Sequence, residues 1–276
     1  MEKRNLTELQ EIEQSLITTY RKSIWSRFIK GIQEFKMINE GDKIAVCMSG
    51  GKDSALLAKC MQELKKHSKV KFDIVFLIMD PGYNEKNRNQ ILLNLKRLNI
   101  PAEIFDSNIF DIVDTRPDHQ CFLCARMRRG CLYGKAQELG CNKIALGHHF
   151  DDVIETALMG MFYGAQFETM MPKLHSTNHK GMELIRPLYF VREEDIIKWR
   201  DKFNLVFLNC ACKVTSRQEG SKRLEIKNLL KELRKTNERI DMNIYNSTKN
   251  VNIGQLLGYI DNGKKYYFMD DYEENN

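Results

Sequence analysis

The amino-acid sequence alternates short apolar runs with longer segments of helical periodicity, and this alternation constrains the fold more than any other feature. Each apolar run is continuous, which is typical of strands that are buried on both faces of a parallel sheet. The runs at 43–48, 72–79, 102–107 and 143–149 predict strands, and the segments at 54–66, 86–99, 125–140 and 151–164 predict helices. Right-handed connections between such elements predict an α/β protein with a doubly wound parallel sheet.

The sequence on either side of this region is mainly helical. Residues 6–38 carry apolar side chains at a spacing close to a helical turn and predict an N-terminal helix, while residues 217–235 end in an amphipathic helix. Residues 192–204 predict a further helix, followed by a short strand at 205–208. We expect three regions: an N-terminal helical region at 1–40, the α/β domain at 41–212, and a C-terminal helix and tail at 213–276.

The composition is that of a globular cytoplasmic protein. The 276 residues carry a net charge of +6, which permits an RNA partner without requiring one. No apolar run approaches the roughly 18 residues of a membrane span, and the first residues lack an apolar signal segment. In a reducing cytosol the 8 cysteines are expected to form no disulfide framework.

The stretch SGGKDS, residues 49–54, joins the first predicted strand to the first helix of the α/β domain. Gly50 and Gly51 would let backbone N–H groups approach an anion, Lys52 adds a positive charge, and Ser54 is expected to cap the helix. The spacing matches neither the Walker A loop nor the dinucleotide-binding G-x-G-x-x-G motif. The stretch instead resembles the pyrophosphate loop of the N-type ATP pyrophosphatases, S-G-G-x-D-S, whose members transfer AMP.

Two cysteine pairs stand apart from the other cysteines. Cys121 and Cys124 have C-x-x-C spacing, and Cys210 and Cys212 follow in a later segment. Such pairs are compatible with zinc, with an iron–sulfur cluster or with redox chemistry. Cys47 is expected to be a buried strand residue. Three arginines directly follow the first pair: Arg126, Arg128 and Arg129. They favour contact with RNA or phosphate over the alternative, in which some of them pair with acidic residues on the surface.

The stretch LGHHFDD, residues 146–152, follows the fourth predicted strand. A parallel sheet places its ligand site beyond the carboxyl ends of its strands, where this stretch would lie. Asp151 and Asp152 are candidates for binding Mg²⁺ beside nucleotide phosphates. The alternative is that Asp151 caps the following helix and Asp152 lies in its first turn.

Five stretches in this order, SGGKDS, CFLCARMRRG, LGHHFDD, MFYG and IRPL, resemble the tRNA 2-thiocytidine synthetases of the PP-loop superfamily, over about residues 24–230. The resemblance implies an adenine nucleotide α-hydrolase-like fold and ATP-dependent thiolation of the anticodon-loop cytidine at tRNA position 32. ATP would adenylate the C2 oxygen, and sulfur would then displace AMP. Here the late cysteine site reads NCAC, with Asn209 where the family commonly has proline.

The resemblance also implies the cofactors and partners. A 4Fe-4S cluster would bind Cys121, Cys124 and Cys210, with Cys212 as the alternative third ligand. The partners would be tRNA and a sulfur donor, either a cysteine desulfurase or free sulfide, and a homodimer is allowed. We assign ATP binding to Ser49, Gly50, Gly51, Lys52, Asp53, Ser54, Asp80, Gly147 and His148, catalysis to Lys52, Asp53 and Asp152, and Mg²⁺ to Asp151 and Asp152.

Two alternatives remain open on the residues themselves. The first is another PP-loop tRNA modifier, such as a thiouridine synthase or a lysidine-type ligase, and the lysidine-type ligase needs no cluster. The second is a non-catalytic nucleotide-binding module in which zinc is held by Cys121, Cys124, Cys210 and Cys212.

Overall fold

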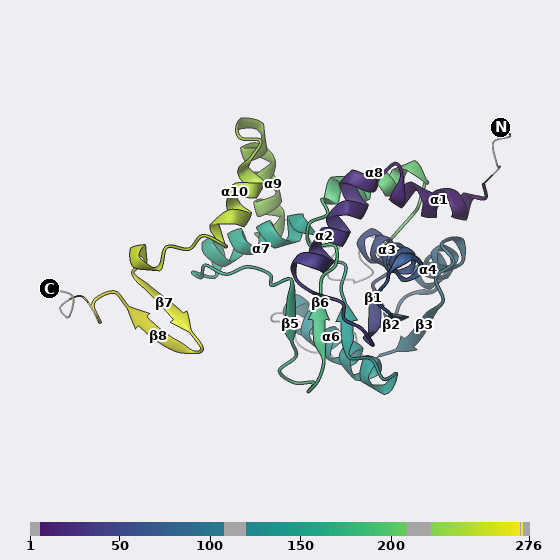
Figure 1. The fold of residues 1–276 in the computed structure, drawn as a ribbon, viewed down its shortest axis with the longest axis horizontal. Helices are drawn as coiled ribbons and strands as arrows, with labels where there is room; N and C mark the ends of the chain where they lie inside the picture. Colours follow the sequence, from purple (N-terminus) through teal and green to yellow (C-terminus); the bar gives the residue numbers. More distant parts are fainter. Residues whose placement is uncertain (1–5, 108–119, 209–221, 271, 273–276) are drawn as a thin grey trace. The chain divides into compact units, whose positions relative to one another are not determined.

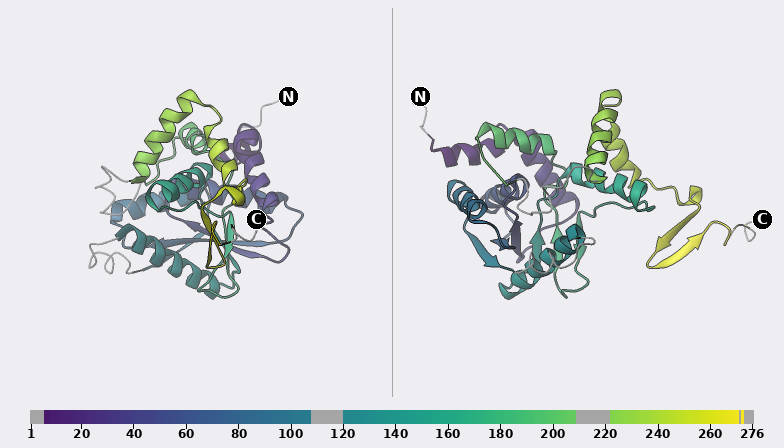
Figure 2. Two further views of the ribbon diagram at one scale, coloured as in Figure 1. Left: turned by 90° about the vertical axis from the view of Figure 1, so that its left-hand side faces the viewer. Right: turned by 180° about the vertical axis from the view of Figure 1, so that it is seen from behind.

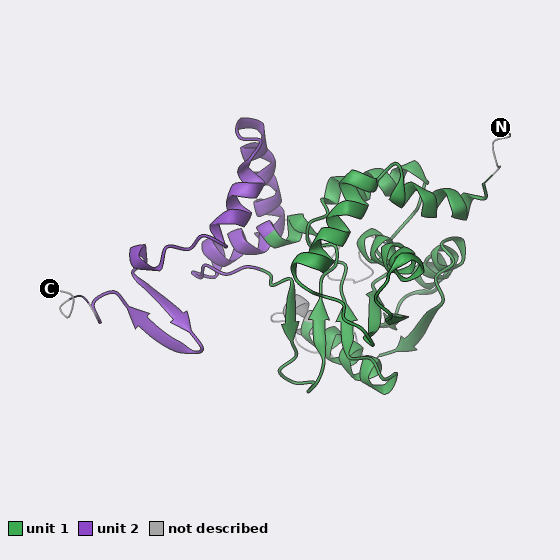
Figure 3. Ribbon diagram, in the orientation of Figure 1, with its two compact units in different colours: residues 1–153, 170–221 green, residues 154–169, 222–276 purple. Residues whose placement is uncertain are grey.

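The computed structural model of the protein describes residues 6–107, 120–208, 222–270 and 272 (Figure 1). The chain forms two compact units (Figure 3). The first contains residues 1–153 and 170–221, and the second contains residues 154–169 and 222–276. The N-terminal helices belong to the first unit, and the expected boundaries at residues 40 and 212 remain predictions.

The first unit is built on a six-stranded sheet in the order β3-β2-β1-β4-β6-β5. All neighbours are parallel except β5, which is antiparallel to β6. The strands are β1 Lys43–Met48, β2 Asp73–Asp80, β3 Ala102–Asp106, β4 Lys143–Ala145, β5 Lys173–His175 and β6 Glu183–Ile185. The doubly wound α/β prediction is confirmed, while the three-residue strands β5 and β6 were missed because they are too short to carry a period.

Helices cover both faces of this sheet (Figures 1 and 2). Helix α3 (Lys52–His67) packs on β1 and β2 with α4 (Glu85–Arg97) on the same side, and α6 (Gln120–Glu138) covers the opposite face. Ala45 and Leu77 pack with Tyr133 of α6. Because side chains alternate along a strand, their neighbours Ile44 and Ile78 face the α3 side. Both faces are thus buried, which explains the continuous apolar runs.

The N-terminal region contains a break that the sequence prediction did not include. It forms α1 (Glu8–Ile17), the π-helical turn η1 (Arg21–Trp25) and α2 (Ser26–Glu34), so the single helix predicted over 6–38 is wrong. A spacing of four residues drifts by about 40° per step on a straight α-helix. The break and the wider π-helical turn remove this drift. They keep one buried row facing the core: Ile12, Leu16, Tyr20, Ile24 and Phe28.

The segment after helix α8 (Glu193–Lys202) is not a strand, so the prediction of a strand at 205–208 is wrong. Its backbone is held by other groups instead of a sheet ladder. The Asn94 side chain donates to the Val206 carbonyl at 2.8 Å, and the Leu208 N–H donates to the Gly50 carbonyl at 3.4 Å. The segment therefore supports the loop after β1.

The second unit contains most of α7 (Phe150–Tyr163), α9 (Lys222–Thr236), α10 (Ile240–Ser247), the short turn η3 (Ile253–Gln255), and a hairpin of β7 (Gly258–Asp261) and β8 (Lys264–Tyr267). Helix α9 confirms the predicted amphipathic helix and buries Ile226 and Leu230. The hairpin was missed, although Asn262-Gly263, with φ of +48° and +82°, is a strong two-residue turn signal. Within the described ranges, no helix combines the length and apolarity needed to cross a membrane.

Candidate functional site

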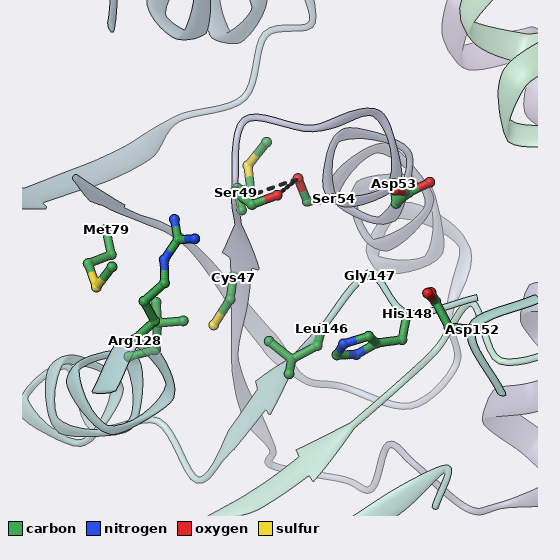
Figure 4. A pocket seen from close by; sticks show the side chains of 12 residues that line it. Cys47, Ser49, Asp53, Ser54, Met79, Arg128, Leu146, Gly147, His148 and Asp152 are labelled. Carbon is green, nitrogen blue, oxygen red and sulfur yellow. Dashed lines mark hydrogen bonds between the residues drawn. The ribbon is translucent and has the colours of Figure 1, made fainter. Parts of the chain in front are cut away.

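A cavity of about 300 Å³ lies at the carboxyl ends of β1, β2 and β4 (Figure 4). This is where a doubly wound sheet places its ligand. The structure brings six of the predicted residues together in its wall: Ser49, Asp53, Ser54, Gly147, His148 and Asp152. Six further residues complete the wall: Cys47, Met48, Met79, Arg128, Leu132 and Leu146.

The loop between β1 and α3 has the geometry of an anion-binding turn. Gly50 has a φ of +79°, which L-residues rarely adopt, and a Cβ there would lie 3.0 Å from the Ile91 side chain. Gly51 is the N-cap of α3 and brings no side-chain cap, so the helix begins with backbone N–H groups directed at the loop. The sequence predicted Ser54 as the cap of this helix, and that prediction is wrong. Ser54 lies inside the first turn of α3.

The Ser54 hydroxyl instead fixes the shape of the loop. It accepts a hydrogen bond from the Ser49 backbone N–H at 3.2 Å and donates to the Gly51 carbonyl at 3.0 Å. The Ser49 hydroxyl in turn accepts from the Gly51 N–H at 3.4 Å. These bonds hold the loop without closing the first turn of α3 to a ligand.

Lys52 lies beside the cavity but is not part of its wall. Its Nζ atom lies 3.0 Å from Glu193 Oε1 and 3.1 Å from Asp53 Oδ1. Although burial works against its charge, the carboxylates of Asp53 and Glu193 raise the pKa of Lys52 above its ordinary value. Glu193 begins helix α8, and sequence reasoning gave no sign that this distant acid meets the loop lysine.

Gly147 allows the loop after β4 to pass directly against the first turn of α3. A Cβ on Gly147 would lie 3.0 Å from both the Asp53 carbonyl carbon and the Ser54 nitrogen. Both contacts are to backbone atoms, which cannot rotate away. The glycine of the LGHHFDD stretch is therefore required by packing, and it joins the two predicted motifs in one cavity wall.

His148 lines the cavity and is oriented by a buried arginine. The Nε of Arg186 donates to His148 Nδ1 at 3.3 Å, and its Nη1 donates to the Met171 carbonyl. Because arginine has no acceptor, His148 Nδ1 must carry a lone pair, which assigns the proton to Nε2. Burial, together with the charge of Arg129, lowers the pKa of Arg186 to about 10. Arg186 belongs to the IRPL stretch, to which sequence reasoning gave no role.

His149, Asp151 and Asp152, which follow His148 in the sequence, have different positions and partners. The His149 N–H donates to Asp152 Oδ2 at 3.0 Å, which caps α7 and leaves Asp152 in the cavity wall. Asp151 lies outside this wall, and its Oδ2 accepts from the Glu193 N–H at 2.8 Å. Asp151 therefore supports the start of α8 and does not cap its own helix. Asp53 contributes the second cavity carboxylate, whose Oδ1 lies 3.1 Å from Lys52 Nζ and 3.8 Å from His149 Nε2.

Asp80 is buried at the end of β2 and does not reach the cavity wall. Its Oδ1 accepts from the backbone N–H groups of Gly82 and Tyr83, at 2.9 and 2.7 Å. This turn carries the Tyr83 hydroxyl to the Ser49 carbonyl at 3.3 Å, and Arg128 donates to that hydroxyl at 3.4 Å. Asp80 thus acts through Tyr83, which sequence reasoning missed.

The cysteine positions are described only in part. Positions 121 and 124 lie among the first five residues of α6, while Cys210 and Cys212 lie outside the described residues. Within the described part, no group of three or more His, Cys, Asp or Glu side chains is arranged to hold a metal ion. Cys47 is buried as predicted, and burial raises the pKa of its thiol to about 12, which makes it unreactive.

Comparison with known proteins supports the combination of this fold with these motifs. Residues 24–217 match the model of the PP-loop domain family. A tRNA-cytidine(32) 2-sulfurtransferase of Coxiella burnetii (strain RSA 331) is 37% identical, over 83% of this chain and 90% of that protein. The enzyme of the same name from Herminiimonas arsenicoxydans is 40% identical, over 83% of this chain and 72% of that protein.

A solved structure shares the fold at low sequence identity. The U34-tRNA thiolase NcsA from Methanococcus maripaludis, determined with its 4Fe-4S cluster, is 20% identical and has a TM-score of 0.64. The match covers 82% of this chain and 78% of that one. The family match covers most of the chain, and the two relatives are 37% and 40% identical over most of their length. The chain therefore belongs to the PP-loop domain family and, within it, to the family of the tRNA-cytidine(32) 2-sulfurtransferases.

Proposed function

We propose that this protein is an ATP-dependent tRNA sulfurtransferase that replaces the C2 oxygen of the anticodon-loop cytidine at position 32 by sulfur. One observation carries the proposal: a single cavity joins the SGGKDS loop, the LGHHFDD loop and Arg128 of the helix that begins with C-x-x-C. The relatives of 37% and 40% identity carry the name of this activity.

The chemistry requires ATP because the C2 oxygen of a pyrimidine is a poor leaving group. The oxygen attacks the α-phosphate of ATP, the bond to pyrophosphate breaks, and the base carries AMP at C2. Sulfur then attacks C2, and the oxygen leaves on AMP. The protein must therefore stabilise negative charge twice, first on the departing pyrophosphate and then on AMP.

The described residues supply the groups for these steps. The glycine loop and the first turn of α3 offer N–H groups to pyrophosphate, and Lys52 supplies the balancing charge. The His148 Nε2–H is a neutral donor in the cavity wall. Arg128 enters from the opposite side, from α6, and can bind the developing charge near the base (Figure 4).

Magnesium fits the acidic side of the cavity. Asp53 and Asp152 both line the cavity and lie on the same side of it in Figure 4. Mg²⁺ is commonly held by one or two carboxylates together with substrate phosphates. We assign the ion to Asp53 and Asp152, since Asp151 supports α8 instead.

The 4Fe-4S cluster fits the start of α6. Positions 121, 124 and 128 share one face of this helix by its 100° periodicity, and Arg128 on that face lines the cavity. Thiolates are also favoured near a helix N-terminus. Cys121, Cys124 and Cys210 would hold the cluster, with Cys212 as the alternative third ligand. When bound, a cluster with three cysteine ligands supplies an open iron for sulfide.

The proposal includes partners that follow from the chemistry. The substrate is tRNA, and the sulfur comes from a cysteine desulfurase or from free sulfide. The reaction takes place in the cytoplasm, where tRNA is modified. The homodimer that the sequence allows is a separate part of the proposal, independent of this chemistry.

The test is nucleoside mass spectrometry of bulk tRNA from a strain lacking the gene, complemented with variants. We expect 2-thiocytidine to be lost on deletion and restored by the wild type and by Cys131→Ala, a matched change at a free cysteine of the same helix. Cys121→Ala should not restore it, although the purified variant should still bind ATP. Unchanged 2-thiocytidine in the deletion strain would contradict the proposal.

Metal analysis of anaerobically purified protein separates the remaining alternatives. Iron and labile sulfide in the wild type, lost in Cys121→Ala and kept in Cys131→Ala, would support the cluster. One tightly held zinc would instead contradict the cluster and support a zinc-bearing modifier or a nucleotide-binding module.

A further inference from the structure

The C-terminal hairpin exposes an unusual amount of apolar surface. We call residues 251–272 the arm; it contains η3, β7 and β8 (Figure 3, purple). Every described residue of the arm except Tyr266 is exposed. The exposed fractions reach 75% at Leu257 and 61% at Ile260, and Tyr267, Phe268 and Met269 add further apolar surface.

An exposed hairpin of this kind is not stable on its own. Two strands in water are marginally stable and need a third strand or a packing surface. In the described part of the arm, the hairpin is held by its two-strand ladder, by the stacked rings of Tyr259 and Tyr266 at 4.7 Å, and by contacts among Tyr267, Phe268 and Tyr272. The edges of β7 and β8 also offer backbone groups for pairing. The exposed apolar side chains and the open strand edges of the arm therefore favour packing on a partner surface.

Charge indicates what kind of surface the arm meets. Residues 251–276 contain two lysines and five acidic residues, a net charge of −3, so with +6 for the whole chain the first 250 residues carry +9. An acidic arm is repelled by the phosphates of RNA and by a second acidic arm. It is attracted to the basic body of another copy of this chain.

The second unit of such a copy offers a matching surface, which we call the acceptor patch. Met161, Phe162 and Phe167 are exposed to 46%, 54% and 45% at the end of α7 and in the loop after it. The basic start of α9 lies beside them, with Lys222 Nζ 5.0 Å from the centre of the adjoining Tyr163 ring. Apolar side chains bordered by cations complement an apolar arm that ends in acidic residues.

We propose that the arm of each chain packs on the acceptor patch of a second copy, so that two arms are exchanged about a two-fold axis. Such an exchange uses the same pair of surfaces twice and closes at two subunits. About ten large side chains, each roughly half exposed, present on the order of 800 Å² per arm, so two arms reach the roughly 1,600 Å² of a specific interface. The inference rests on the homodimer proposed above and names the segment that forms it.

The test measures the mass of the full-length protein across a concentration series by light scattering after size exclusion. We expect a dimer for the wild type and a dissociation constant at least about tenfold weaker for Leu257→Asp combined with Ile260→Asp. Leu93→Asp is the matched control, since Leu93 is 58% exposed on α4 of the first unit, and it should remain dimeric.

Cross-linking then tests where the arm lies. A photo-reactive benzoylphenylalanine in place of Ile260, in a mixture of ¹⁴N- and ¹⁵N-labelled chains, should give mixed-isotope links to residues 161–167. A wild-type monomer would overturn both the homodimer and the arm exchange, whereas a dimer that persists in the double variant would overturn the arm exchange alone. Loss of tRNA binding without a change in mass would also overturn it, in favour of RNA contact. Neither result affects the 2-thiocytidine assay.

Discussion

The Nζ atom of Lys52 lies 3.0 Å from the Oε1 atom of Glu193, although 141 residues separate the two in the sequence. The ion pair holds the loop lysine beside the cavity and outside its wall. Glu193 also donates its backbone N–H to Asp151, so the start of α8 touches both predicted motifs. Under the proposed function, pyrophosphate would therefore compete with the Glu193 carboxylate for Lys52.

We predict that Glu193→Gln binds ATP more tightly than the wild type. A partly buried ion pair is worth about 1 kcal/mol, so its loss should strengthen binding about fivefold. Isothermal titration with ATP measures the change. Glu194→Gln is the matched control, because the Glu194 side chain is 66% exposed and pairs only loosely with Lys198, at 3.6 Å. Weaker binding by Glu193→Gln would indicate that Glu193 positions Lys52 for ATP rather than competing with it.

Arg186→Met should change the protonation pattern of His148. The variant keeps a long side chain but cannot donate to His148 Nδ1, so the proton is no longer confined to Nε2. NMR of the ring nitrogens should show a single tautomer in the wild type and a mixture in the variant, with His179 as the internal reference. We expect the thiolation rate to fall by about 10- to 100-fold. An unchanged tautomer would show that Arg186 has no positioning role.

Gly147→Ala should damage the nucleotide site through the backbone. The new methyl group would lie 3.0 Å from backbone atoms of Asp53 and Ser54, so one of the two loops must move. We expect a loss of about 1–3 kcal/mol in the free energy of unfolding and at least about tenfold weaker ATP binding. Denaturant titration and calorimetry measure these changes. Gly134→Ala on α6 is the matched control, because nothing lies within 4 Å of a Cβ added there. It should leave ATP binding unchanged, which would show that replacing a glycine is not by itself enough to weaken binding.

The buried ion pairs of Lys143, at the start of β4, should contribute strongly to the free energy of unfolding. Its Nζ lies 2.8 Å from Asp42 Oδ2 and 3.1 Å from Glu183 Oε2, and all three residues are buried. Lys143→Met leaves two buried carboxylates and should lower the free energy of unfolding at pH 7 by about 3–5 kcal/mol. The control Lys65→Met removes an exposed pair with Asp73 and should cost less than about 1 kcal/mol.

The same cluster predicts a dependence on pH. Although burial opposes ionisation, hydrogen bonds from Lys143 and Asn142 hold the pKa of Asp42 below its ordinary value of 3.8. The stabilisation that the Asp42 carboxylate gives to the folded state is therefore fully present above pH 3.8, and it is lost as the pH falls below that value. The loss in the free energy of unfolding caused by Lys143→Met should become smaller as the pH falls. In the variant, the buried carboxyls of Asp42 and Glu183 can then take up protons and lose their charge. A deficit that stays constant down to pH 3 would contradict this assignment.

The sequence was sufficient for the features that depend on local order. Continuous apolar runs predicted β1, β2, β3 and β4, and the strand–glycine–helix pattern placed the loop at residues 49–54. Pleat and helix periods are local, so they are visible in a single chain. The sequence prediction failed where spacing alone misleads, as in the break between α1 and η1, where a four-residue spacing resembles one continuous helix.

Only the tertiary structure decided which polar side chains meet. Asp151 and Asp152 are adjacent in the sequence, yet a helix turns successive side chains by about 100°, so one supports α8 and the other lines the cavity. The pairs Lys52–Glu193 and His148–Arg186 join segments that come together only when the sheet is complete. The sequence by itself thus determined the fold and the chemical types at the site, because these follow from local periodicity. The structure decided the partner of each charge, because long-range packing sets those distances.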